Sequence, residues 1–155
     1  MKITRVYTCF DACGSKNPAA TDLKYYFLLR AWSSRAPLAS IFVDVHRASG
    51  AAKPADLQLE LGNRLRNSDV LLLILSERTA ASGGWLSWEI EFGAGHCRLP
   101  IVCAYTGSDD VESQVRRRGW WPQALQRVDS RMHVCAMHVP FRPAALASAF
   151  RHLVH

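Results

Sequence analysis

Apolar residues along this chain follow two spacings, one typical of strands and one typical of helices. Short apolar runs predict strands, and the segments between them repeat apolar residues every three or four positions, as amphipathic helices do. The run from Asp69 to Leu75 is almost continuously aliphatic, which is typical of a strand covered on both faces. The predicted strands are 3–10, 41–45, 69–75, 99–105 and 132–139, and the predicted helices are 20–33, 54–65, 85–95, 122–127 and 143–153.

The strict alternation of strand and helix predicts an α/β fold. We expect a flavodoxin-like, doubly wound, five-stranded parallel sheet with helices on both faces. The chain has 155 residues, 49% of them hydrophobic and 21% charged, and residues 1–155 are expected to form a single domain. Ligands of such sheets bind beyond the carboxyl ends of the strands, near the reversal of strand order. The loops 11–19, 46–53 and 76–84 are therefore the expected site.

The segment from Trp85 to Phe92 combines large rings with two carboxylates. Because successive helical residues turn by about 100°, Glu89 is expected to share a face with the rings, and Glu91 to lie outside it. That face holds Trp85, Trp88 and Phe92, whereas Leu86, Ile90 and Ala94 fall on the far side. A carboxylate among apolar rings loses hydration, and such sites are often functional. Glu89 is therefore predicted to be the special acid and Glu91 an ordinary one.

Four segments in a fixed order resemble a TIR domain, and more narrowly the stand-alone TIR-like proteins of bacterial Thoeris antiphage systems. They are Phe10-Asp11 and the stretches 41–45, 65–76 and 85–91. The resemblance covers about residues 3–105, and residues 106–155 complete the sheet with a fifth strand and a final helix. In catalytically active TIR domains, the glutamate of a W-x-x-x-E arrangement in this helix is essential for breaking the nicotinamide–ribose bond of NAD. Trp85 and Glu89 have that spacing, whereas Trp88 and Glu91 do not.

The resemblance implies an NAD-consuming enzyme with Glu89 as its catalytic residue. It would release nicotinamide and an ADP-ribose-derived signalling nucleotide, expected to be cyclic, in antiphage defence. Substrate contacts are implied for Phe10, Asp11, Arg47, Ser49, Ser76, Trp85 and Trp88. NAD is then a substrate, and no cofactor or metal is expected. The family commonly has a basic residue just after the first strand, where this chain has Asp11-Ala12, and Arg47 could instead meet a phosphate.

The same resemblance implies partners. TIR–TIR contacts would build a homo-oligomer, and a separate downstream effector would respond to the nucleotide. A cytoplasmic location is expected, because the chain lacks a signal-peptide pattern and its longest apolar run is far shorter than the roughly 20 residues that span a bilayer. The alternative is a non-catalytic TIR scaffold that acts by self-association and partner recruitment.

Charge and cysteine content exclude several other classes. The net charge is +6, yet its densest run, 116–118, is interpreted as a solvated segment, so no nucleic-acid partner is expected. Five cysteines without a C-x-x-C pair indicate reduced thiols. In the predicted last strand, His133 and Cys135 lie on one side and His138 on the other, so the three do not converge on zinc. Asp44 lacks the acidic partners of a phospho-acceptor site, and no glycine-rich phosphate loop is present.

Overall fold

The structure, a computed structural model, describes residues 4–11, 22–39, 42–45, 54–81, 84–107, 117–131 and 135–154. Strands and helices alternate along the chain as expected. The elements are β1 (Thr4–Cys9), α1 (Leu23–Ser33), β2 (Phe42–Val45), α2 (Pro54–Arg66), β3 (Val70–Leu75), η1 (Thr79–Ala81), α3 (Trp85–Ile90), η2 (Glu91–His96), β4 (Ile101–Tyr105), η3 (Arg117–Trp120), α5 (Gln123–Arg131), β5 (Ala136–Pro140) and α6 (Pro143–Val154).

The strands of the described residues form one sheet in the order β2-β1-β3-β4-β5. Every neighbouring pair runs parallel. This is a doubly wound order, and the strand order reverses between β1 and β3. The expected α/β class with a parallel sheet is confirmed. The carboxyl ends of β1, β3 and β4 share one edge of the sheet, where a ligand of this fold class would bind.

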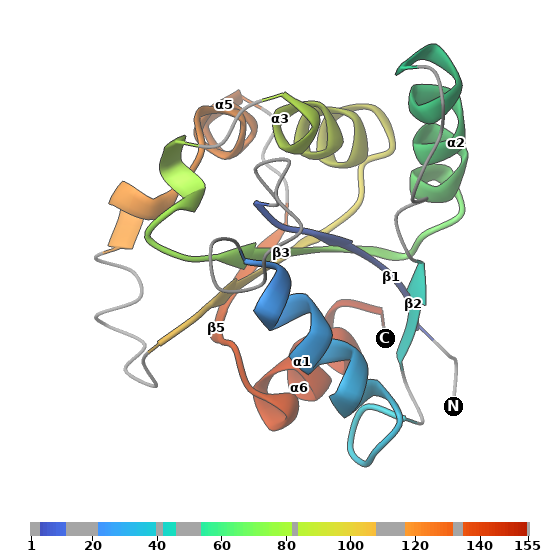
Figure 1. Cartoon of the computed structure of the whole chain (residues 1–155), viewed down its shortest axis with the longest axis vertical. Coiled ribbons are helices and arrows are strands. Elements are labelled where there is room, and N and C mark those ends of the chain that lie inside the picture. The colour runs from blue at the N-terminus through green and yellow to red at the C-terminus, as the bar shows by residue number, and fades with distance from the viewer. Residues whose placement is uncertain are drawn as a thin grey trace.

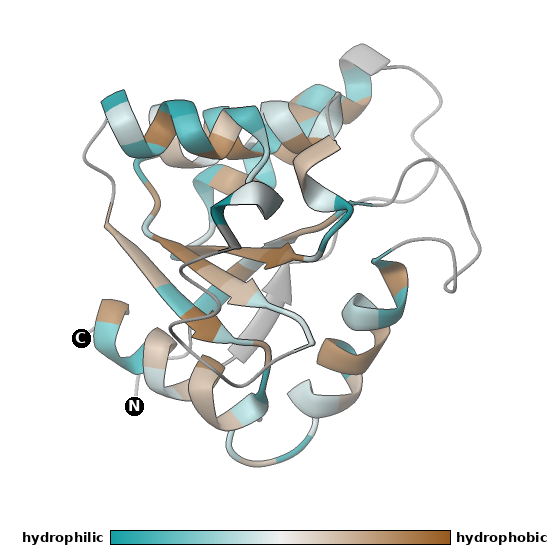
Figure 2. Cartoon of the chain, turned by 90° about the vertical axis from the view of Figure 1, so that its left-hand side faces the viewer, coloured by the Kyte–Doolittle hydropathy of each residue, from teal (hydrophilic) through white to brown (hydrophobic). Residues whose placement is uncertain are grey.

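Two helical layers cover the sheet (Figure 1). Helices α2, α3 and α5 lie over one face, and α1 and α6 lie over the other. Strand residues alternate between the two cores: Tyr7 and Leu73 pack under α3, whereas Val6 and Leu72 pack against the α1 side. Colouring by hydropathy shows apolar strands between helices that mix polar and apolar residues (Figure 2).

Strand β3 lies at the centre because its sequence can be apolar on both faces. All six of its residues are buried, as the continuous aliphatic run predicts. Helix α2 also follows its predicted repeat: Leu61 and Leu65 are fully buried and Leu57 packs partly against them. None of the described helices is long and apolar enough to cross a membrane.

The helix that carries Glu89 differs from its expected form. It was predicted to close around residues 93–95, but it continues as a π-helix from Glu91 to His96. Gly93 permits the close packing of this segment, because an added Cβ would lie 3.1 Å from the Leu65 side chain. An α-helical wheel therefore describes α3 only up to Ile90, since a π-helix turns by a smaller angle per residue.

The carboxyl-terminal third keeps the predicted order with shifted boundaries. Helix α5 runs to Arg131, beyond the predicted end at residue 127, and β5 begins at Ala136, while residues 132–134 lie outside the described part. Trp121 is buried in the α3-side core, and Trp120 packs partly against it, so packing explains both rings of this segment. Among the described cysteines, Cys9 and Cys103 are buried, Cys97 is partly buried and Cys135 is exposed.

Candidate functional site

Glu89 is a fully buried acid on the inner side of α3. Its side chain has no solvent-accessible surface. The Cys9 thiol at the end of β1 donates to the Glu89 carboxylate, with Sγ 3.9 Å from Oε2. Leu86 and Ile90 are buried beside it in the same core. The fold thus carries this carboxylate to the carboxyl-terminal half of β1, close to the edge of the sheet where ligands of this class bind.

The aromatic side chains of this helix contact one another and pack partly against the same core as Leu86 and Ile90. The rings of Trp85 and Trp88 pack edge to face with their centroids 5.7 Å apart, and the rings of Trp88 and Phe92 stack with centroids 5.0 Å apart. Trp88 and Phe92 line a groove of about 270 Å³ against α2. Glu89 is offset by about 40° from Trp85 and by about 60° from Leu86. By this geometry Glu89 lies between the ring face and the Leu86 face, and the expectation that it points among the rings stays a prediction.

Glu91 has the surroundings of an ordinary surface acid. It forms an exposed ion pair with Arg127 of α5. Both side chains are nearly half exposed, so water and salt screen the attraction and its contribution to stability is small. The two glutamates of this helix therefore differ as expected: Glu89 is enclosed, and Glu91 faces water.

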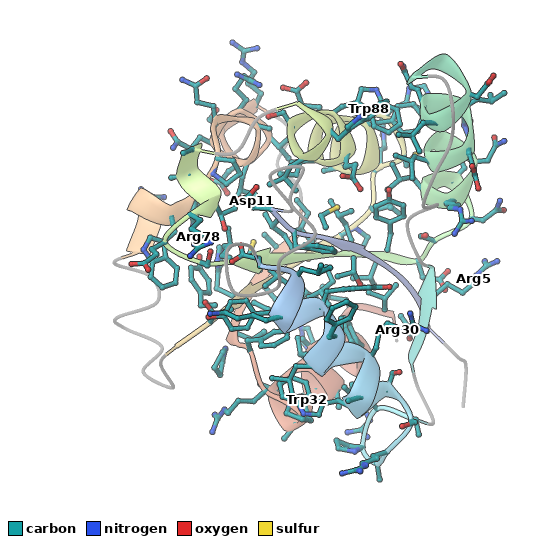
Figure 3. All side chains as sticks on the ribbon, in the orientation of Figure 1. Arg5, Asp11, Arg30, Trp32, Arg78 and Trp88 are labelled. Carbon is teal, nitrogen blue, oxygen red and sulfur yellow. The ribbon has the colours of Figure 1, made fainter. Side chains whose placement is uncertain are left out.

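Phe10 and Asp11 follow β1 and are both buried. Phe10 stacks on Tyr26 of α1, with ring centroids 5.0 Å apart, so its ring packs on the α1 side of the sheet and away from α3. The Asp11 carbonyl accepts a hydrogen bond from the backbone N–H of Asp22 at 3.1 Å. In Figure 3, Asp11 and Arg78 lie well away from Trp88, which sits in the upper helical layer.

Ser76 lies at the end of β3 and anchors a buried polar cluster with Asp22. The Ser76 hydroxyl donates to Asp22 Oδ2 at 2.8 Å, and the Thr79 hydroxyl lies 3.5 Å from the same oxygen. The Ser76 N–H donates to Thr79 Oγ1 at 2.8 Å. Burial raises the pKa of the Asp22 carboxyl; the Ser76 hydrogen bond opposes this shift, and the nearby Asp11 charge adds to it. Sequence spacing gave no sign of Asp22, which the fold brings from 54 positions away.

A pocket of about 230 Å³ opens over this cluster at the edge of the sheet. Its walls come from the start of α1, the segment after β3, the end of β4 and η3. The lining residues are Asp22, Lys24, Tyr25, Ser76, Glu77, Arg78, Thr106, Gly107 and Trp120. Of the predicted substrate-binding residues in the described part of the chain, Ser76 lines this pocket and Trp88 lines the separate groove on α2. Arg47 and Ser49 lie outside the described residues.

A second polar cluster joins β4, β5 and the segment before α5. The Trp121 indole N–H donates to the Tyr105 hydroxyl at 2.8 Å, and that hydroxyl lies 2.8 Å from His138 Nδ1. His138 stacks on Trp121 with an interplanar angle of 4°. Burial is the largest cause of the lowered pKa of His138. Within the described residues, no group of three or more acidic, cysteine or histidine side chains could hold a metal ion.

Comparison with known proteins decides the family. A model of the TIR-like domain of the Thoeris protein ThsB matches residues 7–111. The chain belongs to this family. The match includes the second half of β1, the Ser76 segment and the helix of Glu89, so the ordered motifs of the sequence resembled the correct family. Among curated proteins, no sequence matches the chain.

One solved structure shares the fold of this TIR-like chain. The crystal structure of a conserved protein from Enterococcus faecalis V583 is 14% identical, with a TM-score of 0.59, and the alignment covers 97% of this chain and 99% of that one. The activated Roq1 resistosome is described as directly recognising the pathogen effector XopQ. Its TIR domains are 14% identical to this chain, with a TM-score of 0.45, and the alignment covers 97% of this chain and 81% of that one. At such identities, the likeness to the Enterococcus protein shows the fold alone.

Proposed function

We propose that this TIR-like protein cleaves the nicotinamide–ribose bond of NAD, with Glu89 as the catalytic residue. The observation that carries the proposal is a fully buried glutamate, at W-x-x-x-E spacing from Trp85, beside the end of β1. A buried carboxylate is costly, and such groups are enriched at functional sites. Membership of the TIR-like family supports the same residue, because active TIR domains use this glutamate.

Cleavage of the nicotinamide–ribose bond requires little from the protein beyond a carboxylate near the sugar. The bond between ribose C1′ and the pyridine nitrogen breaks, and its electron pair leaves with neutral nicotinamide. Positive charge then develops on the ribose, and an ionised Glu89 stabilises that charge and binds ribose hydroxyls. If water attacks C1′ and loses a proton, the product is ADP-ribose. If a nitrogen of the adenine attacks instead, the product is a cyclic isomer, which a separate effector would read as a signal in antiphage defence.

A matched pair of variants tests the assignment. Pure protein is incubated with NAD, and nicotinamide release is followed by chromatography across protein concentrations and with a crowding agent. Glu89→Gln should lower the release at least about a hundredfold, since removing one charge-stabilising group from an active site typically has that effect. Glu91→Gln, on the same helix but exposed and paired with Arg127, should keep most of it. Equal rates for the two variants would remove Glu89 from the mechanism.

The burial of Glu89 also favours a second candidate, a TIR scaffold without enzymatic activity. In this structure the carboxylate offers no surface to a substrate, so a packing role explains it without chemistry. A scaffold would assemble through TIR–TIR contacts and recruit partners. The two functions are separated by measuring mass against concentration alongside nicotinamide release. Assembly that Glu89→Gln leaves intact, with no nicotinamide at any concentration, would support the scaffold.

A further inference from the structure

We propose that the outer surface of helices α1 and α6 binds the surface of an anionic lipid bilayer, as a peripheral contact. Both helices cover the face of the sheet opposite to α3, which holds Glu89 (Figure 1). In Figure 3, Arg30 and Trp32 of α1 lie on the other side of the sheet from Trp88. Such binding is independent of NAD cleavage. Two features of this layer favour an anionic bilayer: the sign of its charges and two exposed apolar side chains.

The charged residues of the α1–α6 layer are almost all cations. Residues 22–39 and 142–154 contain one acid, Asp22, and it is only 2% exposed. The exposed charged residues of these two segments are Lys24, Arg30, Arg35, Arg142 and Arg151. The pocket rim beside α1 adds Glu77 and Arg78, whose charges cancel.

The opposite layer has a different balance of charge. Helices α2, α3, η2 and α5 contain five acids and four arginines. Among the helices that cover the two faces of the sheet, the excess of cations therefore lies on the α1–α6 side. A surface of this kind attracts anionic lipid headgroups, and the attraction falls off within about 10 Å at moderate salt, so only cations near the bilayer contribute.

Two large apolar side chains of α1 face water. Phe27 is 51% exposed and Leu28 is 42% exposed. At about 100° per residue, both lie beside Lys24 and Ala31, on the side of the helix opposite to its buried residues. Arg35 follows the carboxyl end of the same helix and is also exposed. Apolar side chains flanked by cations are typical of helices that lie in the interface of an anionic bilayer.

The same two features disfavour other partners. A second copy that met this face symmetrically would bring its own cations against those of the first, and like charges repel. A nucleic acid would attract the cations, but it offers no apolar layer for both Phe27 and Leu28. A bilayer satisfies both features, because lipid phosphates meet the cations while the boundary of headgroups and acyl chains accepts the apolar side chains.

Cosedimentation of the full chain with vesicles tests the electrostatic part. Vesicles of phosphatidylglycerol mixed with phosphatidylcholine should bind the chain, vesicles of phosphatidylcholine alone should not, and added salt should weaken the binding. Lys24→Gln combined with Arg35→Gln should weaken it about 25-fold, since each cation near such a surface strengthens binding about fivefold. Arg66→Gln combined with Arg131→Gln removes the same charge from the opposite layer and should change binding by no more than about twofold.

A second pair of variants tests the apolar part. Phe27→Ser combined with Leu28→Ser should weaken vesicle binding at least about tenfold, because each of these half-exposed side chains loses about half of a full apolar burial. Leu59→Ser is the matched control: Leu59 is 64% exposed but lies on α2, so its loss should leave vesicle binding unchanged. Circular dichroism spectra like that of the unmodified chain verify that the variants fold.

Four results would overturn the proposal. They are equal binding to anionic and neutral vesicles, no binding to either, equal losses for matched variants of the two layers, and a contact with a different macromolecule at this face. The last is measured without vesicles, by mass against concentration and by titration with duplex DNA. Self-association or DNA binding that depends on Phe27 and Leu28, while vesicle binding does not, would assign the face to that partner instead.

Discussion

Replacing Tyr105 by phenylalanine removes one oxygen from the core and tests whether the cluster with Trp121 and His138 stabilises the fold. Tyr105 is fully buried, and its hydroxyl is the meeting point of two hydrogen bonds of 2.8 Å. The indole N–H can only donate, so the Tyr105 oxygen accepts from Trp121. The phenol proton is then available to His138 when Nδ1 is the unprotonated nitrogen of that ring. Burial strongly raises the pKa of the Tyr105 phenol, with the Cys103 charge as a lesser cause, so the phenol keeps this proton at neutral pH.

The expected loss follows from these two bonds. Loss of the His138 hydrogen bond costs about 1 kcal/mol. Loss of the Trp121 hydrogen bond costs more, about 1–3 kcal/mol, because it leaves the indole N–H buried without an acceptor. Because the ring itself remains, no cavity forms apart from the space of one oxygen. Tyr105→Phe should therefore lower the free energy of unfolding by about 2–4 kcal/mol.

Urea denaturation followed by tryptophan fluorescence measures this change. Tyr25→Phe is the matched control, because Tyr25 is half buried and makes ring contacts without a hydrogen bond through its hydroxyl in the described residues. Its loss should be within about 0.5 kcal/mol. A double-mutant cycle with His138→Phe should show coupling of about 1 kcal/mol. A Tyr105→Phe loss no larger than that of Tyr25→Phe would refute the reasoning.

Two further outcomes follow from buried ionisable groups. The pKa of Asp22 in the folded chain is raised above its ordinary value of 3.8, so folding favours the protonated carboxyl. This contribution to the free energy of unfolding is complete below pH 3.8 and is lost as the pH rises through the folded-state pKa. The urea midpoint of Asp22→Asn should therefore rise relative to the unmodified chain between pH 3 and 7, and a difference that does not change with pH would contradict this. Burial raises the pKa of Cys103 to about 12, so a thiol reagent should label exposed Cys135 in the native protein and Cys103 only after unfolding; rapid native labelling of Cys103 would be inconsistent with its burial.

Local sequence patterns predicted the fold well because each strand and helix is specified by neighbouring residues. The aliphatic run of β3 and the leucine repeat of α2 need only a period to be recognised. The helical wheel separates Glu89 from Glu91, but an offset of about 40° from Trp85 does not say which side of a helix meets the sheet. The packing of Leu86 and Ile90 decides that, and it depends on tertiary structure.

The polar clusters could not be predicted from spacing at all. Ser76 and Asp22 are 54 positions apart, and Tyr105 and His138 are 33 apart. Each residue is unremarkable in its own segment, and only the parallel sheet brings the members together. The serine after β3 was expected at the rim because the carboxyl end of a strand identifies the edge, whereas its partner on α1 had no comparable signal.

The packing of α3 limits how a substrate can reach Glu89. Leu86 and Ile90 are buried in the core beneath the helix that carries the carboxylate. Lifting α3 from the sheet would expose both, at about 1.5–3 kcal/mol for each side chain. An approach along the sheet from the carboxyl end of β1, where Cys9 already contacts the carboxylate, leaves this apolar contact intact. If Glu89 acts on NAD, the less costly route is therefore from the edge of the sheet, with α3 kept in place as the rigid support of its glutamate.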